Sequence, residues 1–202
     1  MKIKAVIFDA TGMVIYGKRF SISFFDDYGI PLKDISLFFD NEFQDCLIGQ
    51  ADLKTVIKPY LTKWNWKKST VEFLDYWFKT EHKIDKNMVK IINDLKKIKV
   101  KCFLATNQEK YRIDYMVNKM GFSSLFNNIY ASCQLGYKKS QKSFYQILAK
   151  KIKNDFGINK NEVLYWDDHL AHVKLALSLG FNAKLYQDFL SFKREINKYL
   201  KI

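Results

Sequence analysis

Apolar residues in this chain occur either in short unbroken runs or at helical spacing, and the two patterns alternate. The unbroken runs predict strands at 3–9, 100–107, 128–132, 162–168 and 182–188. Positions three and four residues apart predict helices at 88–98, 111–121, 140–155 and 170–180. Unbroken apolar strands are typical of a parallel sheet that is covered on both faces. The alternation therefore predicts an α/β fold with a Rossmann-like, doubly wound parallel sheet.

Two details of the predicted helices can be checked against a structure. In the first helix, Met88, Ile91, Ile92, Leu95 and Ile98 share one face, and we expect that face to be buried. In the helix at 140–155, Ser140 stands where a capping residue is favoured, so we expect it to cap this helix.

Residues 17–86 do not follow the alternation and read as helices, including segments 51–64 and 69–80. Ser69 and Glu72 have the spacing of a capping box, and Pro59 should kink or break the first of these segments. We interpret 17–86 as a helical cap inserted into an α/β core formed by 1–16 and 87–202. Its aromatic residues are interpreted as the core of the cap: Trp64, Trp66, Tyr76 and Trp77.

Composition narrows the class of protein. The 202 residues are 48% hydrophobic, which is enough for a sizeable core. The formal net charge is +13, but the cations are mostly scattered lysines rather than a basic stripe with interleaved aromatics, which argues against a nucleic-acid partner. No apolar run is long enough to cross a membrane. Three widely spaced cysteines indicate reduced thiols and a cytoplasmic protein.

Polar residues that could bind ligands or take part in catalysis stand at the ends of three predicted strands. Asp9 ends the first strand, Thr106 and Asn107 end the second, and Asp167 and Asp168 end the fourth. In open parallel sheets, ligands bind outside the carboxyl ends of the strands. We therefore expect these groups to share one crevice.

Four motifs resemble those of the haloacid dehalogenase-like hydrolase superfamily, in the order in which that family has them. They are "VIFDATG" with Asp9, "CFLATNQ" with Thr106 and Asn107, "LGYKKSQKSFYQIL" with Lys139, and "VLYWDDHLAHVKLALSLGFNAKLY" with Asp167 and Asp168. Lys138 is the neighbouring alternative to Lys139. The chain is most similar to the branch with a helical cap after the first strand, which contains many small sugar-phosphate phosphatases.

The resemblance implies a magnesium-dependent phosphomonoesterase that acts on a small phosphorylated metabolite, as a monomer or homodimer. It implies that Asp9 is the nucleophile and forms an aspartyl-phosphate. Asp9, Asp168 and the carbonyl group of Thr11 would bind Mg²⁺, with Asp167 as a direct ligand or as the support of one. The phosphoryl oxygens would then be bound by Lys139, Thr106 and Asn107.

The sequence departs from the family at Thr11, where a second aspartate usually acts as general acid and base. A threonine hydroxyl does not ionise near neutral pH, so Thr11 cannot replace it. Three alternatives follow: a phosphatase without this acid, a carbon–halogen hydrolase, for which "FDATG" is a close match, or a binding protein with impaired catalysis. The paired acids Asp167 and Asp168 favour the first alternative, a phosphatase without this acid.

His169 and His172 stand where the family has other residues. Their spacing places both on one side of the helix that follows Asp168, as in a metal-binding pair, but no third soft ligand accompanies them. We expect His169 at the rim of the site or the start of this helix, and His172 packed beneath it.

Overall fold

The computed structural model describes residues 2–200 and contains a five-stranded sheet. Its strands are β1 (Ala5–Phe8), β2 (Lys101–Thr106), β3 (Asn128–Ala131), β4 (Val163–Asp167) and β5 (Asn182–Leu185). All pairs are parallel and the spatial order is β3-β2-β1-β4-β5. The order of strands therefore reverses between β1 and β4, and such a switch point is where open sheets bind ligands.

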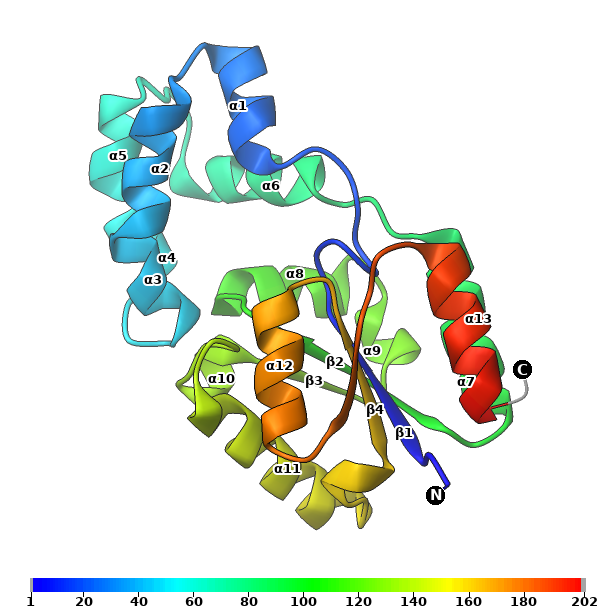
Figure 1. Ribbon diagram of the computed structural model, residues 1–202. Helices are drawn as coiled ribbons and strands as arrows, with labels where there is room; N and C mark the ends of the chain where they lie inside the picture. Colours follow the sequence, from blue (N-terminus) through cyan, green and yellow to red (C-terminus); the bar gives the residue numbers. More distant parts are fainter. Residues whose placement is uncertain (1, 201–202) are drawn as a thin grey trace.

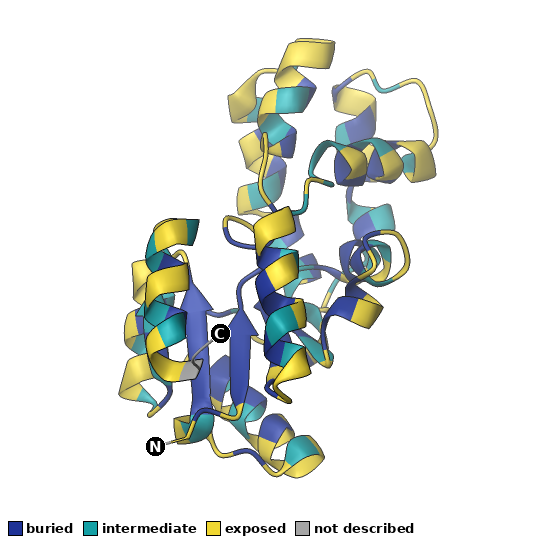
Figure 2. Cartoon of the chain, turned by 90° about the vertical axis from the view of Figure 1, so that its right-hand side faces the viewer, coloured by how far each residue is buried: buried dark blue, intermediate teal, exposed yellow. Residues whose placement is uncertain are grey.

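Helices cover both faces of the sheet (Figure 1). One face packs against α7 (Lys86–Lys97), α8 (Lys110–Asn118), α9 (Phe122–Leu125) and α13 (Phe189–Leu200). The other packs against α10 (Ser132–Leu135), α11 (Lys142–Phe156) and α12 (Leu170–Ser178), and the 3₁₀ turn η1 (Lys160–Glu162) leads into β4. The central strands β1 and β4 are wholly buried, which explains their unbroken apolar sequence (Figure 2). The predicted α/β fold is confirmed.

Between β1 and α7 the chain forms a helical layer, which we call the cap. It consists of α1 (Phe20–Tyr28), α2 (Leu32–Asp40), α3 (Glu42–Leu47), α4 (Leu53–Val56), α5 (Lys58–Lys63) and α6 (Thr70–Thr80). The cap has its own apolar cluster, in which Trp64 and Trp77 are buried. The capping box of Ser69 and Glu72 is confirmed. The predicted helix at 51–64 is broken between α4 and α5, and Pro59 lies in the first turn of α5.

Two linkers join the cap to the core and pair with each other. Ile15 and Ile84 form an antiparallel bridge, and the N–H of Tyr16 donates to the carbonyl of Lys83 at 2.9 Å. The buried guanidinium of Arg112, on α8, donates to the carbonyl groups of Phe78 and Glu81 at 2.8 and 2.9 Å. The cap is thus hydrogen-bonded to the core where the second linker leaves α6.

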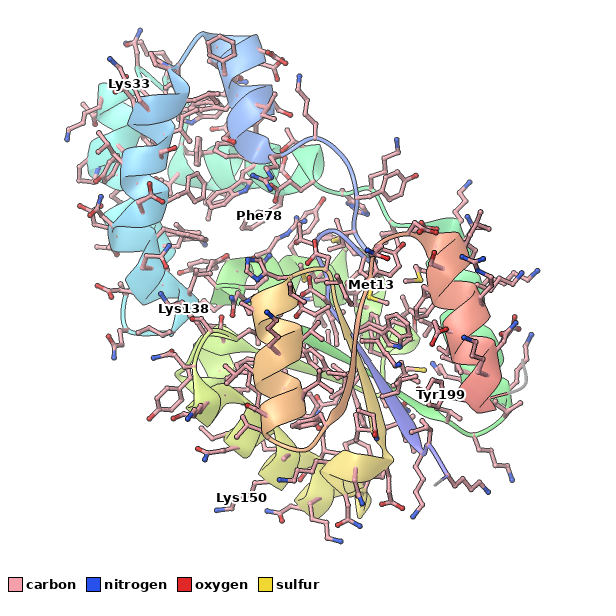
Figure 3. All side chains as sticks on the ribbon, in the orientation of Figure 1. Met13, Lys33, Phe78, Lys138, Lys150 and Tyr199 are labelled. Atoms are coloured by element: carbon pink, nitrogen blue, oxygen red, sulfur yellow. The ribbon has the colours of Figure 1, made fainter. Side chains whose placement is uncertain are left out.

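The other end of the cap also contacts the core. Lys138 lies at the boundary between cap and core, where its Nζ donates to Oε1 of Gln44 on α3 at 2.9 Å (Figure 3). The hydroxyl of Tyr111, at the start of α8, donates to Asp52 at 2.8 Å. The cap is therefore held closed over the core at two separate places.

Two details that the sequence predicted for these helices are wrong. Ile98 was expected to be buried but is 47% exposed, because α7 ends at Lys97 and the chain then turns through Lys99 at a positive φ of 63°. Ser140 does not cap α11. This helix begins at Lys142, so Gln141 rather than Ser140 is its N-cap residue.

Candidate active site

The carboxylates at the ends of β1 and β4 come together at the switch point of the sheet. Asp9 follows β1, Asp167 ends β4 and Asp168 follows it, and oxygen atoms of the three lie within 4.8 Å of one another. The N–H of Asp9 donates to the carbonyl of Trp166 at 3.0 Å, so the pairing of the two strands sets this approach. Asp9 and Asp167 are buried, while Asp168 is exposed.

Lys139 is the lysine that reaches the acids. Its Nζ contacts Oδ1 of Asp9 and lies 2.9 Å from Oδ2 of Asp167, although the ammonium group is buried. The side-chain carbonyl of Asn107 accepts the N–H of Lys139 at 2.8 Å and so holds this segment against the end of β2. Lys138 points to the cap instead, where it donates to Gln44.

Asp167 accepts four hydrogen bonds. Its Oδ2 accepts from Lys139 and from the hydroxyl of Tyr165 at 2.7 Å. Its Oδ1 accepts the N–H of His169 at 2.9 Å and faces Nδ1 of His172 at 3.1 Å. A carboxylate has about four lone-pair positions. Because those of Asp167 are occupied, the carboxylates with free oxygen positions in this cluster belong to Asp9 and Asp168.

Burial and charge act on these groups in different directions. Burial raises the pKa of Asp9 to about 6 against the attraction of Lys139, and Asp167 and Asp168 add to the rise. Burial also opposes ionisation of Asp167, but hydrogen bonds from His172 and the charge of Lys139 hold its pKa well below its usual range. Burial disfavours the ammonium form of Lys139, yet the two carboxylates hold its pKa above the ordinary value.

The turn after Asp9 brings the backbone against Asp168. Gly12 has a φ of +92°, and a Cβ atom there would lie 2.0 Å from Oδ2 of Asp168. Only glycine therefore allows this carboxylate to lie against the turn. Thr11, which precedes it, is exposed and borders the same opening as Asp168. Thr106 is buried at the end of β2, next to β1.

The acids fit the requirements of Mg²⁺. This ion prefers an octahedron of hard oxygen ligands and is usually bound by one or two carboxylates together with water and substrate oxygens. Asp9 and Asp168 supply two such carboxylates, and the turn at Thr11 and Gly12 brings backbone close to Asp168. Within residues 2–200, His169 and His172 do not belong to this group of possible ligands. Their rings contact each other in a tilted arrangement, with 4.6 Å between the ring centroids.

Sequence reasoning missed the groups that hold these side chains in place. Tyr165 was assigned only to an apolar strand, and nothing in a single sequence separates its hydroxyl from that of a packed tyrosine. His172 is packed as expected, and it also contacts Asp167. His169 is the N-cap residue of α12, which agrees with its expected position at the start of this helix. Glu109, the buried N-cap residue of α8, was not identified.

Comparisons with known proteins agree with the motifs. The family model of haloacid dehalogenase-like hydrolases matches residues 3–180. A predicted hydrolase of this type from Porphyromonas gingivalis has a similar structure, with a TM-score of 0.79, 23% identity and coverage of 100% of both chains. A family enzyme from Bacteroides thetaiotaomicron gives a TM-score of 0.81 at 17% identity, over 97% of this chain and 99% of that one.

A second structure of the Bacteroides thetaiotaomicron enzyme, described as a complex with magnesium and inorganic phosphate, matches with a TM-score of 0.78 at 17% identity, over 94% of this chain and 98% of that one. No curated protein sequence is significantly similar to this chain. Among the described residues, no helix has both the length and the apolar character needed to span a bilayer. Because the family model covers most of the sequence and the structural matches agree with it, the chain belongs to the haloacid dehalogenase-like hydrolases.

Proposed function

We propose that this hydrolase is a magnesium-dependent phosphomonoesterase that acts on a small phosphorylated metabolite through an aspartyl-phosphate on Asp9. The observation that carries the proposal is the position of Lys139 between the buried carboxylates of Asp9 and Asp167, next to the free carboxylate of Asp168. The magnesium and phosphate in the Bacteroides thetaiotaomicron structure support the same chemistry.

The residues divide the work between attack and neutralisation of charge. An oxygen of Asp9 attacks phosphorus while the bond from phosphorus to the leaving oxygen breaks, and the two oxygens must be in line. Lys139 balances the charge that gathers around Asp9 and the phosphoryl group. Water then attacks the phosphorus of the aspartyl-phosphate, which releases phosphate and restores Asp9. Because the hydroxyl of Thr11 does not ionise near neutral pH, the leaving oxygen takes its proton from water, and the proton that the attacking water loses returns to the solvent.

Asp9 and Asp168 would hold Mg²⁺, together with the carbonyl of Thr11. The ion supplies electrostatic stabilisation of the phosphoryl oxygens. In this proposal Asp167 is the fixed acceptor that keeps Lys139 in place, since its lone pairs are already occupied.

The test is a screen of phosphorylated metabolites with Mg²⁺ and with EDTA, alongside haloacids. We expect hydrolysis of phosphomonoesters that requires Mg²⁺ and is lost in Asp9→Asn, because an amide is a poor nucleophile. Phosphatase activity that survives Asp9→Asn in a purified sample would contradict the role of Asp9. Release of halide that persists in EDTA would replace the proposal with a carbon–halogen hydrolase.

A further inference from the structure

A cavity of about 320 Å³ opens beside the candidate active site. Thr11 and Asp168 border it on the side of the core, and Lys18, Arg19 and Glu81 from the two linkers border it on the side of the cap. Pockets that take small molecules have volumes of about 300 Å³ or more. The cavity therefore has room for the small organic group of a phosphomonoester.

The direction of attack places the organic part of a substrate in this cavity. Asp9 and Lys139 are buried, so the site opens past Thr11 and Asp168, which are exposed. In-line displacement puts the leaving oxygen on the side of phosphorus opposite Asp9. The leaving group must therefore extend away from the buried floor and towards the linkers.

Of the two cations that border the cavity, Arg19 is the one that is not already paired within the described chain. Among residues 2–200, the guanidinium of Arg19 forms no hydrogen bond or ion pair, and it is exposed. Lys18, by contrast, is paired with Asp26. The buried Arg112 donates to two carbonyl groups, and Arg194 donates to Ser191 at 3.2 Å. Arg19 is therefore the arginine whose planar donors are free for a ligand.

Glu81 does not cancel this charge. Its Oε1 accepts the N–H of Phe20 at 3.0 Å, and its Oε2 lies 4.0 Å from the guanidinium of Arg112. The carboxylate of Glu81 thus already has a donor and a cation of its own. The neighbouring carboxylate of Asp168 is the one that the proposed function assigns to Mg²⁺.

We infer that Arg19 binds a second anionic group of the substrate, so that the preferred substrates are small phosphomonoesters that also carry a carboxylate or a second phosphate. This inference rests on the proposed function and narrows it to a substrate class. A guanidinium suits both anions, because it presents two parallel donors to a pair of oxygens.

The test compares matched substrates in the wild type, Arg19→Ala and Arg19→Lys. 3-Phosphoglycerate is paired with glycerol 3-phosphate, and fructose 1,6-bisphosphate with fructose 6-phosphate, so that each pair differs by one anionic group. We expect the wild type to prefer one doubly anionic member, and the preferred pair identifies the anion. Arg19→Ala should raise KM for that substrate about 10- to 100-fold, the range for hydrogen bonds to a charged group. Arg19→Lys should retain part of the preference.

p-Nitrophenyl phosphate and Arg194→Ala provide the controls. p-Nitrophenyl phosphate has no second anionic group, so its KM should change much less in Arg19→Ala than the KM of the preferred substrate. Arg194→Ala should behave as the wild type with every substrate. If p-nitrophenyl phosphate is hydrolysed but Arg19→Ala keeps the wild-type preference, or if all substrates lose equally, the inference is wrong while the proposed function stands. If no phosphomonoester is hydrolysed, the proposed function and the inference both fail.

Discussion

The hydroxyl of Tyr165 donates a 2.7 Å hydrogen bond to the same oxygen of Asp167 that lies 2.9 Å from Nζ of Lys139. Tyr165 and Asp167 are both on β4, two positions apart, so their side chains leave the same face of the sheet. Tyr165 is fully buried and packs on Tyr145 of α11, with 5.7 Å between ring centroids. A buried residue of the core thereby fixes the carboxylate that holds Lys139.

Tyr165→Phe should lower kcat about tenfold and leave KM nearly unchanged. The change removes one of four hydrogen bonds to Asp167, and small displacements of Lys139 would slow phosphoryl transfer more than they would weaken binding. Steady-state kinetics with p-nitrophenyl phosphate measures the two constants separately. Tyr130→Phe is the matched control, because it also removes a buried hydroxyl but one without a hydrogen-bond partner in the described chain. If kcat fell equally in both variants, the loss would come from altered packing of the core and not from the hydrogen bond to Asp167.

Gly12→Ala should weaken the binding of Mg²⁺ about tenfold or more. A Cβ atom at this position would lie 2.0 Å from Oδ2 of Asp168 and force that carboxylate away from the turn. Binding to the folded state raises Tm, so we expect Mg²⁺ to stabilise the wild type and have much less effect on the variant. Gly157→Ala tests for strain alone, because Gly157 also has a positive φ, +69°, but nothing lies within 4 Å of its Cβ position. A normal Mg²⁺ response in Gly12→Ala would exclude Asp168 as a ligand.

Glu109→Gln should make the stability of the protein less dependent on pH. Burial raises the pKa of Glu109 from 4.5 to about 7, while its carboxylate accepts the N–H groups of Tyr111 and Arg112. A carboxyl group with a raised pKa in the folded state contributes its full stability below pH 4.5 and loses it as pH rises through about 7. The loss is on the order of 3 kcal/mol.

Urea unfolding at pH 5 and pH 8 measures this effect. Glutamine does not ionise, although its single side-chain oxygen can accept only one of the two capping hydrogen bonds. The free energy of unfolding of the variant relative to the wild type should therefore be higher at pH 8 than at pH 5. Glu72→Gln is a suitable control, because Glu72 also accepts a backbone N–H near the start of a helix, at Ser69, but is exposed. An identical pH profile for Glu109→Gln and the wild type would mean that Glu109 is already ionised in the folded protein.

The strand ends could be predicted because unbroken apolar runs mark the buried strands of a parallel sheet, and ligands bind outside the carboxyl ends of such strands. Asp9, Asp167 and Asp168 each follow an unbroken apolar run, and the spatial order of strands brings those runs side by side. The sequence pattern alone does not contain that order. That order is a finding of the structure. The resemblance of the motifs to a known family favoured Lys139 over Lys138.

Residues that act through contacts between distant segments could not be found in this way. Tyr165 looks like any other apolar position of β4, and Glu109 looks like a solvated residue at a helix start until the cap and α10 cover it. Arg19 has the same limitation, because its importance comes from a cavity that forms only when the linkers lie beside Thr11 and Asp168. The predictions for Ile98 and Ser140 were wrong, because turn geometry rather than periodicity decides where a helix begins or ends.

Thr11→Asp is the most direct test of what the missing acid means. If Thr11 lacks only a proton-transfer role in an otherwise competent site, aspartate should raise turnover, up to the roughly 10²–10⁴-fold that such a group contributes. Hydrolysis of the aspartyl-phosphate should gain most, since that step needs an activated water. With a reactive donor such as acetyl phosphate, the wild type should therefore accumulate phosphoenzyme and the variant should not.

A second carboxylate next to Asp9 also adds negative charge, which disfavours ionisation of both acids unless a cation offsets it. Assays at several Mg²⁺ concentrations separate this effect from the gain in proton transfer, because the charge effect weakens as the metal site fills. Thr11→Asn is the matched control, since it has nearly the shape of aspartate but cannot ionise and should gain nothing. If Thr11→Asp remains folded and binds Mg²⁺ yet turns over no faster than Thr11→Asn, another group activates water or the chain is a binding protein rather than a phosphatase.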